Sequence, residues 1–333
     1  HRMCSTLPEL RCRFLNPHVV RIPNRRFAFF TDERQARLLE VWRPGEWDGK
    51  VLEVRKPDYL KINDRRLKQA NSLRGRLDRL RRFFTNENMH PKDPTLLVHP
   101  GWRFRSRAAE EWRKETYKRL RRTPFEQVKD RPFVFLGLHK QPEASVDVFG
   151  RYYEDQLRNI ENLWRALPQD WLLLVKEHTN AIGDRPLRFY RRLQALPRVV
   201  LVDEHTNSYE LIRRARLVAT ITGTIAYEAA LMGVPAVTFA PVFFNRLNSC
   251  RQISLEDLAA CRNLAELAEE LHRQPDNRAA FSEYLMRNSF AGNFLDPISA
   301  PAVLEQENIR LLARAVHIAC EQVAPKALAA QDR

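Results

Sequence analysis

The stretch LVATITGTIAYEAALMGVPAVTF, residues 217–239, decides the fold. It begins with an apolar run over 217–221, has helical spacing over 224–232, and returns to an apolar run over 234–239. A buried strand, a helix and a second buried strand are the pattern of a βαβ unit with parallel strands. Gly233 stands where the helix should end, because glycine adopts the left-handed conformation at little steric cost.

The same alternation extends back to residue 131. Apolar runs at 133–138, 171–175 and 199–202 alternate with helical spacing at 155–167, 187–196 and 209–215. Strands without polar alternation are buried on both faces, between two layers of helices. We therefore expect a doubly wound, Rossmann-type α/β domain over residues 131–300. Ligands of such a sheet bind at the carboxyl ends of its strands.

The net charge of +15 is concentrated in the first 130 residues. They hold 32 Lys and Arg against 17 Asp and Glu, whereas the other 203 residues hold 24 of each. This asymmetry predicts a boundary near residue 130 and a smaller, basic amino-terminal α/β domain. Strand-like runs at 26–30, 50–54 and 95–98, and a helix over 108–122, are expected within it. A helix over 302–323, in a final segment 301–333, is expected to cross back toward this domain.

A basic amphipathic helix is expected over residues 65–84. Its apolar stripe is surrounded by five arginines; the stripe is Leu73, Leu77, Leu80 and Phe84, and the arginines are Arg74, Arg76, Arg79, Arg81 and Arg82. A solvated face of the amino-terminal domain explains this pattern most simply. The sharper alternative is attraction to an anionic membrane surface. Nucleic acid is not expected as a partner, because no recognised binding motif is present.

Composition excludes several protein classes. An apolar fraction of 44% argues against disorder, and no stretch approaches the roughly 20 apolar residues of a membrane span. The start of the sequence lacks the apolar core of a signal peptide, so a cytoplasmic protein is expected, peripheral on the inner face of the membrane if the basic helix binds there. The five cysteines are scattered without zinc spacing, which indicates reduced thiols and no metal.

Polar residues follow three of the expected strands. The first loop runs from His139 to Glu143, the second is Lys176-Glu177-His178, and the third is Thr222-Gly223-Thr224. The third loop opens a helix, and backbone N–H groups at a helix amino terminus bind phosphate and other anions. Glu228 lies one turn into that helix on the same face, where it can accept hydrogen bonds from sugar hydroxyls. Because all three loops should meet at one edge of the sheet, they form the candidate site.

These segments resemble the capsule polysaccharide biosynthesis family, which includes β-Kdo transferases. The resemblance covers residues 133–244 through FVFLGLHKQPEAS, LLLVKEH and NSYELIRRARLVATITGTIAYEAALMGVPAVTF. The family's Gln-Pro motif is Gln141-Pro142, whereas its His-Pro motif is changed, because Thr179 follows His178. The Thr-Gly-Thr segment and the Gly-Val-Pro that follows it are shared more widely among GT-B glycosyltransferases. The resemblance therefore implies a GT-B-like fold and a glycosyltransferase.

The resemblance also implies roles for the loop residues. A nucleotide-sugar donor, CMP-Kdo-like, would bind through its phosphate to the donor-binding set of Lys176, His178, Thr222, Gly223, Thr224 and Glu228. Glu143 and His139 are the first candidates for the base or nucleophile, beside Gln141 of the motif, with Asp147 and Asp155 as second choices. Asp155 is more simply explained as a helix-terminal carboxylate. No Asp-x-Asp motif is present, so neither a metal nor another cofactor is expected.

The expected acceptor is a growing surface polysaccharide or a lipid-linked glycan. Several alternatives stay open at this stage. The donor can be a UDP- or GDP-sugar or phosphoribosyl pyrophosphate instead. A nucleotide-sugar epimerase shares the fold, but its acidic and arginine signature is not found. A non-catalytic basic adaptor with a degenerate donor domain is the non-enzymatic alternative.

Overall fold

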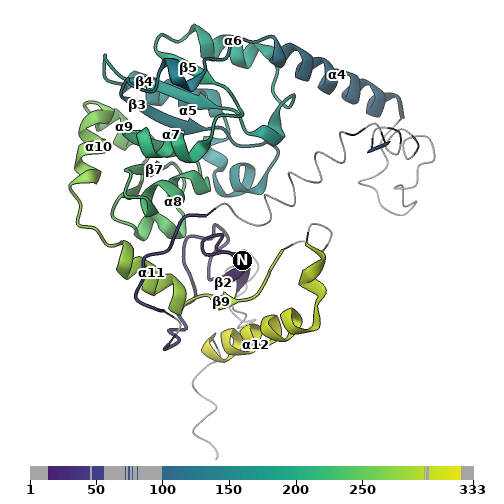
Figure 1. Ribbon diagram of the computed structural model, residues 1–333, viewed down its shortest axis with the longest axis vertical. Helices are drawn as coiled ribbons and strands as arrows, with labels where there is room; N and C mark the ends of the chain where they lie inside the picture. The colour runs from purple at the N-terminus through teal and green to yellow at the C-terminus, as the bar shows by residue number, and fades with distance from the viewer. Residues whose placement is uncertain are drawn as a thin grey trace, which may run out of the picture.

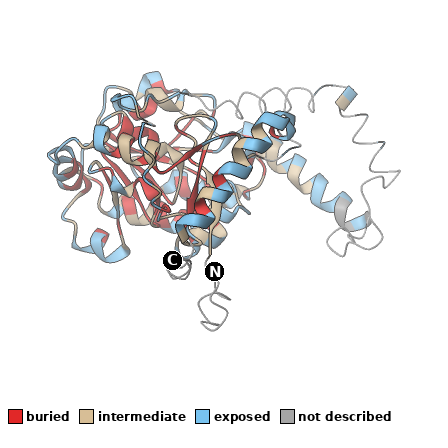
Figure 2. Cartoon of the chain, turned by 90° about the horizontal axis from the view of Figure 1, so that it is seen from below, coloured by how far each residue is buried: buried red, intermediate tan, exposed pale blue. Residues whose placement is uncertain are grey.

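The computed structural model describes residues 14–45, 47–55, 100–295 and 300–323, with the isolated positions 72, 74, 75, 77, 81 and 297. These residues form a parallel α/β domain and a small antiparallel sheet packed beside it (Figure 1). Buried residues gather in the large sheet and on the helix sides that face it (Figure 2). The chain is therefore of the α/β class, as expected.

The large sheet has six parallel strands. They are β3 (Phe133–Gly137), β4 (Leu172–Lys176), β5 (Val199–Val202), β6 (Leu217–Thr220), β7 (Ala236–Thr238) and β8 (Cys250–Gln252). Their order in the sheet is β5-β4-β3-β6-β7-β8, and Leu136 of β3 pairs with Val175 on one side and Ala219 on the other. The chain builds one half outward from β3, then returns to place β6 beside it. The gap between the ends of β3 and β6 is thus the topological switch point, where doubly wound sheets bind ligands.

Helices cover both faces of this sheet. One face carries α5 (Gln156–Arg165), α6 (Leu187–Ala195), α9 (Leu255–Ala260) and α10 (Leu264–His272); the other carries α7 (Ser208–Arg214), α8 (Thr224–Leu231) and α11 (Arg278–Arg287). Alternate residues of β3 serve the two faces: Phe133 and Phe135 pack with α7 and α8, whereas Val134 and Leu136 pack with α5. Each face is apolar, so the strands read as continuous apolar runs.

Helix starts are fixed by short polar side chains. Asp155 caps α5 by accepting hydrogen bonds from the backbone N–H groups of Leu157 and Arg158. Asn207, Ser254 and Asn263 cap α7, α9 and α10 in the same way. These caps satisfy amide groups that have no partner inside the helix. The structural explanation of Asp155 is therefore confirmed.

The small sheet joins segments far apart in the sequence. Its strands β1 (Asn16–Val19), β2 (Arg26–Phe30) and β9 (Phe290–Ala291) are antiparallel neighbours. Helix α12 (Gln306–Val323) follows a short 3-10 turn at Pro301–Leu304 and packs Ala315 and Ala319 against Phe27 and Phe29 (Figure 1). The helix expected from the apolar spacing of this segment is thus present, and it packs beside strand β2 of the amino-terminal part of the chain.

Other expectations about the amino-terminal part are corrected or lie outside the described residues. Residues 50–54 are not a strand: the N–H of Leu52 donates to the hydroxyl of Ser282 instead of to a strand neighbour. The helix expected over 108–122 is α4 (Pro100–Lys118), which begins and ends earlier. The run at 95–98 and most of the 65–84 helix lie outside the described residues.

Described residues on both sides of position 130 share the hydrophobic clusters of the large sheet. Ile22 and Phe30 pack in the cluster of α7 and α8, and Tyr117 packs in that of α5 and α6. The division at residue 130 stays a prediction. Among the described residues, no helix combines the length and the apolarity that crossing a membrane requires.

Candidate functional site

The three loops meet at one edge of the large sheet. They follow β3, β4 and β6, and these three strands are direct neighbours in the sheet. The loops after β3 and β6 are joined where the hydroxyl of Thr222 donates to the carbonyl of Ser145, at 3.0 Å. The three loops therefore share one edge of the sheet, as the sequence predicted, and the candidate site lies at the switch point.

His139 is buried at the centre of this edge. Its Nε2 lies 2.8 Å from Oγ1 of Thr220, and the N–H of Gly223 donates to the same oxygen at 3.2 Å. This contact between Nε2 and the Thr220 hydroxyl holds the ring of His139 in place. Burial lowers the pKa of His139 to about 3, with help from the nearby charges of His178 and Arg185. The ring is therefore neutral, and its lowered pKa makes it a weak general base, the role predicted from sequence.

Gly223 leaves the amino terminus of α8 uncovered. A Cβ at this position would lie 2.5 Å from Thr220 Oγ1 and 3.2 Å from His139 Cε1, so a side chain does not fit. Among the described residues, the backbone N–H groups of Thr224 and Ile225 have no acceptor. These amides and the positive end of the helix dipole favour an anion at this point.

Glu228 is buried one turn further along α8. The hydroxyl of Tyr209, on α7, lies 3.4 Å from its Oε1. Burial raises the pKa of Glu228 to about 7, and the charge of Arg21 opposes that rise. A carboxyl group so placed can accept hydrogen bonds from the hydroxyls of a ligand whose anion sits at the amino terminus of α8.

Arg21 also contacts the candidate site, and sequence reasoning missed it. It belongs to the turn between β1 and β2, and its Nη1 lies 3.4 Å from Oγ1 of Thr224. Its charge also lowers the pKa of His139. The two residues are 203 positions apart. The basic amino-terminal composition gave only a general signal of positive charge.

Lys176 is the last residue of β4 and His178 lies two residues beyond it, and the two side chains have different partners. The Lys176 ammonium donates to the carbonyl of Thr206 at 2.6 Å and to the hydroxyl of Ser208 at 2.8 Å, and burial lowers its pKa to about 8. It is thus tied to the loop between β5 and α7. Nδ1 of His178 accepts the N–H of Asn180 at 3.2 Å, so Nε2 carries the proton and stays available as a donor.

A buried ion pair holds the first two loops together. Arg185 lies 2.6 Å from Glu177 and also donates to the carbonyl of His139. Glu177 in turn accepts from the hydroxyl of Tyr190 at 2.6 Å and from the N–H of His178 at 2.8 Å. Removing one partner of such a pair leaves an uncompensated buried charge. The pair therefore fixes the position of both histidines.

Gln141 and Asp147 shape the loop after β3. The peptide bond between Gln141 and Pro142 is cis. The side-chain oxygen of Gln141 accepts a hydrogen bond from the amide of Gln156 at 2.6 Å, and its side-chain nitrogen donates to Asp147 at 3.2 Å. The other oxygen of Asp147 accepts the N–H of Glu143 at 2.7 Å. The side chains of Gln141 and Asp147 are therefore occupied by hydrogen bonds that shape this loop. The carboxylate of Glu143 stays exposed. Burial lowers the pKa of His178, and the charge of Glu143 opposes that lowering.

Of the residues predicted from sequence, the structure therefore gathers one compact group at the switch point: His139, His178, Gly223, Thr224 and Glu228. Glu143 borders it, whereas Gln141, Asp147 and Thr222 hold loops in place and Lys176 points to the β5–α7 loop. Gln156 is a second omission; its amide bridges the backbone of His139 and the side chain of Gln141.

One group of metal-ligating residue types occurs among the described residues. Side-chain atoms of Asp203, Glu204 and His205 lie within 4.8 Å of one another. Both oxygens of Glu204 accept hydrogen bonds from Arg122, at 2.6 and 2.7 Å. Because this guanidinium already neutralises the carboxylate, the group is a poor fit for a cation.

No family model and no curated protein matches the chain. Solved structures similar to it include two of KpsC from Thermosulfurimonas dismutans. Both are β-Kdo transferases. The β-Kdo 2,7 transferase is 15% identical, over 92% of this chain and 83% of that one, with a TM-score of 0.39. The β-Kdo 2,4 transferase is 13% identical, over 96% and 83%, with a TM-score of 0.45. The structure of S. aureus MnaA with UDP is 14% identical, over 56% and 47%, with a TM-score of 0.34.

Proposed function

We propose that this protein is a metal-independent GT-B-type glycosyltransferase that uses a nucleotide-sugar donor. The observation that carries the proposal is the uncovered amino terminus of α8 at the switch point of the sheet, with His139 and Glu228 beside it. The free amides suit a phosphate, and Glu228 suits the hydroxyls of a ribose or sugar. The motif resemblance given above supports a CMP-Kdo-like donor.

Transfer requires stabilisation of the departing phosphate. The bond between the anomeric carbon and a phosphate oxygen breaks, and the electron pair leaves with the phosphate. The α8 amides and the Nε2–H of His178 would donate to the charge that develops there, beside the neutral ring of His139. These donors belong to the protein itself, which supports a reaction without a metal.

The acceptor hydroxyl also has to lose its proton as its oxygen bonds to the anomeric carbon. Glu143 is the best candidate for this base, because its carboxylate is exposed and close enough to His178 for its charge to act on the pKa of that ring. Gln141 and Asp147 would position it, through the N–H of Glu143 that Asp147 accepts. The acceptor we propose is a surface polysaccharide or lipid-linked glycan, reached from the inner face of the cytoplasmic membrane. The basic charge of the first 130 residues supports this last point.

A thermal-shift panel tests the function. CMP, UDP, GDP and phosphoribosyl pyrophosphate are added to the wild-type protein, and one of them is expected to raise Tm. The variants His178→Ala and Glu228→Ala should weaken binding of that ligand by about 1–3 kcal/mol, because each removes a group that is proposed to form a hydrogen bond with it. His272→Ala is the control, because His272 is an exposed histidine at the end of α10. A panel without a stabilising ligand, or binding that ignores both site variants, rejects the assignment.

A further inference from the structure

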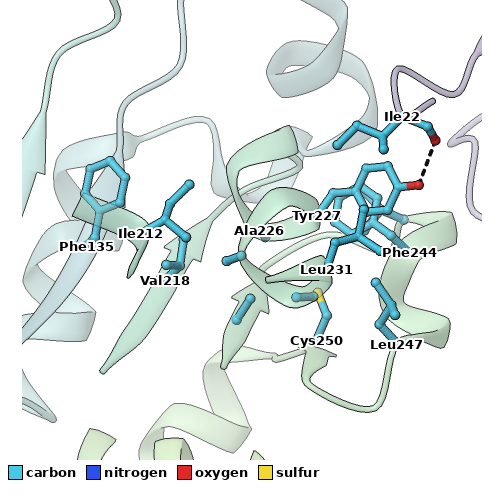
Figure 3. Packing of buried hydrophobic residues seen from close by; sticks show 14 of the residues in the cluster. Ile22, Phe135, Ile212, Val218, Ala226, Tyr227, Leu231, Phe244, Leu247 and Cys250 are labelled. Carbon is cyan, nitrogen blue, oxygen red and sulfur yellow. Dashed lines mark hydrogen bonds between the residues drawn. The ribbon is translucent and has the colours of Figure 1, made fainter. Parts of the chain in front are cut away.

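The turn between β1 and β2 is fixed against α8. The Tyr227 hydroxyl, on α8, donates to the carbonyl of Ile22 at 2.9 Å, and Ile22 is buried in the same cluster as Tyr227 (Figure 3). Val20 is buried on the other side of Arg21. The backbone on both sides of Arg21 is therefore held in place by packing, and this fixes the position of the Arg21 Cα.

The side chain of Arg21 reaches the first turn of α8. Its Nη1 lies 3.4 Å from Oγ1 of Thr224, and its charge lowers the pKa of both Glu228 and His139. Arg21 thus faces the residues that surround the uncovered helix terminus. It brings a permanent positive charge to the point where the donor phosphate is proposed to bind.

Two features of Arg21 work against stability of the empty protein. Its φ of 65° is left-handed, a conformation that costs a non-glycine residue about 1–2 kcal/mol. The amino terminus of a helix carries a partial positive charge, so a cation is disfavoured there. Strained or electrostatically unfavourable residues concentrate at functional sites. An anion between the guanidinium and the α8 amides would turn this repulsion into attraction on both sides.

We propose that Arg21 binds the donor phosphate together with the amides of α8, so that the amino-terminal hairpin and the parallel sheet hold the anion jointly. This inference rests on the proposed function and adds a binding residue from a different part of the chain. A guanidinium suits the role because its paired N–H groups match two oxygens of one phosphate. The hairpin thereby becomes part of the donor site.

Calorimetric titration of Arg21→Gln tests the proposal. The ligands are the best nucleotide of the panel, its nucleoside and inorganic pyrophosphate. Loss of the guanidinium should weaken the nucleotide and pyrophosphate about 10- to 100-fold and leave the nucleoside unchanged. Arg21→Lys should recover part of the loss, because it restores the charge without the fork. Arg25→Gln is the matched control, since Arg25 lies in the same turn, also with positive φ, and is exposed.

The outcomes separate this inference from the proposed function. Equal loss for nucleotide and nucleoside would make Arg21 a residue that only shapes α8, and unchanged binding would remove it from the site; either result overturns the inference. Pyrophosphate binding that depends on Arg21 supports it even if no nucleotide binds, in which case the nucleotide-sugar function alone fails. Binding of neither ligand rejects both. The Tm of the empty Arg21→Gln protein should be equal to or above that of the wild type, because the charge at the positive end of α8 is removed, and such a result excludes misfolding as the cause.

Discussion

The substitution Gly223→Ala probes the centre of the site with a single methyl group. The backbone at Gly223 has φ −71°, so alanine brings no backbone strain, and the effect is confined to the added carbon. That carbon would lie 2.5 Å from Thr220 Oγ1, far inside the usual contact distance. Thr220 is fully buried on β6 and cannot turn away without losing its hydrogen bond to His139.

The expected loss of stability combines two contributions. Overpacking by one methyl group costs about 1–3 kcal/mol. A weakened hydrogen bond between Thr220 and His139 adds about 1 kcal/mol. The sum of about 2–4 kcal/mol corresponds to a fall in Tm of about 3–6 °C, taking an unfolding entropy near 2.1 cal/mol/K per residue. Nucleotide affinity should fall as well, because His139 and the first turn of α8 move apart.

A double-mutant cycle identifies the cause. In a Thr220→Ala background the 2.5 Å contact is gone, and the remaining contacts with the His139 ring are 3.2 and 3.4 Å. Gly223→Ala should then cost less than about 1 kcal/mol, which gives a coupling energy of about 1–3 kcal/mol. Chemical denaturation of the four proteins measures it. If Gly223→Ala lowers the free energy of unfolding equally in both backgrounds, the contact with Thr220 is not the cause. If it has no effect in either, a methyl group fits at Gly223 and the site is not as tightly packed as described.

Two other predictions concern charge. The folded pKa of Glu228 is about 7 and its ordinary value 4.5, so its carboxyl favours the folded state below pH 4.5 and loses that stabilisation as pH rises through 7. Glu228→Gln should therefore be more stable than wild type by about 3 kcal/mol at pH 8 and by little at pH 5, as measured by urea denaturation. If the stabilities of the two proteins instead change with pH in the same way, the pKa of Glu228 is not raised by burial. The basic amino-terminal part should sediment with anionic liposomes at low salt and be released at high salt, because screening shortens the range of charge attraction. Changing Arg74, Arg76, Arg81 and Arg82 to Glu should abolish sedimentation, and binding that survives these changes would leave only a solvated basic face.

The parallel sheet was predictable because its signals are local. Each strand from β3 to β7 is an apolar run beside a helix with clear spacing, and the end of α8 is marked by Gly233, whose φ is +76°. The loops could be placed at one edge from the same pattern, since parallel strands share their carboxyl ends. The short strands β8 and β9, with three and two residues, give no periodic signal and were missed.

Side-chain directions and distant contacts were not predictable. The sequence places Lys176 in the right loop, but the carbonyl of Thr206 and the hydroxyl of Ser208 draw its ammonium to the side. Asp147 was a candidate catalytic group, but both its oxygens accept hydrogen bonds that shape the loop. Arg21 reaches the site only because tertiary packing brings a hairpin turn onto α8, and no spacing rule encodes such a contact.

The pairing of β2 with β9 also bears on how the protein is made. Phe27 of β2 pairs with Phe290 of β9, so more than 260 further residues are synthesised before β9 can pair with the hairpin. At roughly 5–20 residues per second this interval lasts tens of seconds on the ribosome. Until then Phe27 and Phe29 lack the cover that Phe290 and α12 provide, and the nascent chain exposes them to chaperones. The parallel sheet can close around its own core earlier, so the candidate site is completed last, once the hairpin is fixed in place.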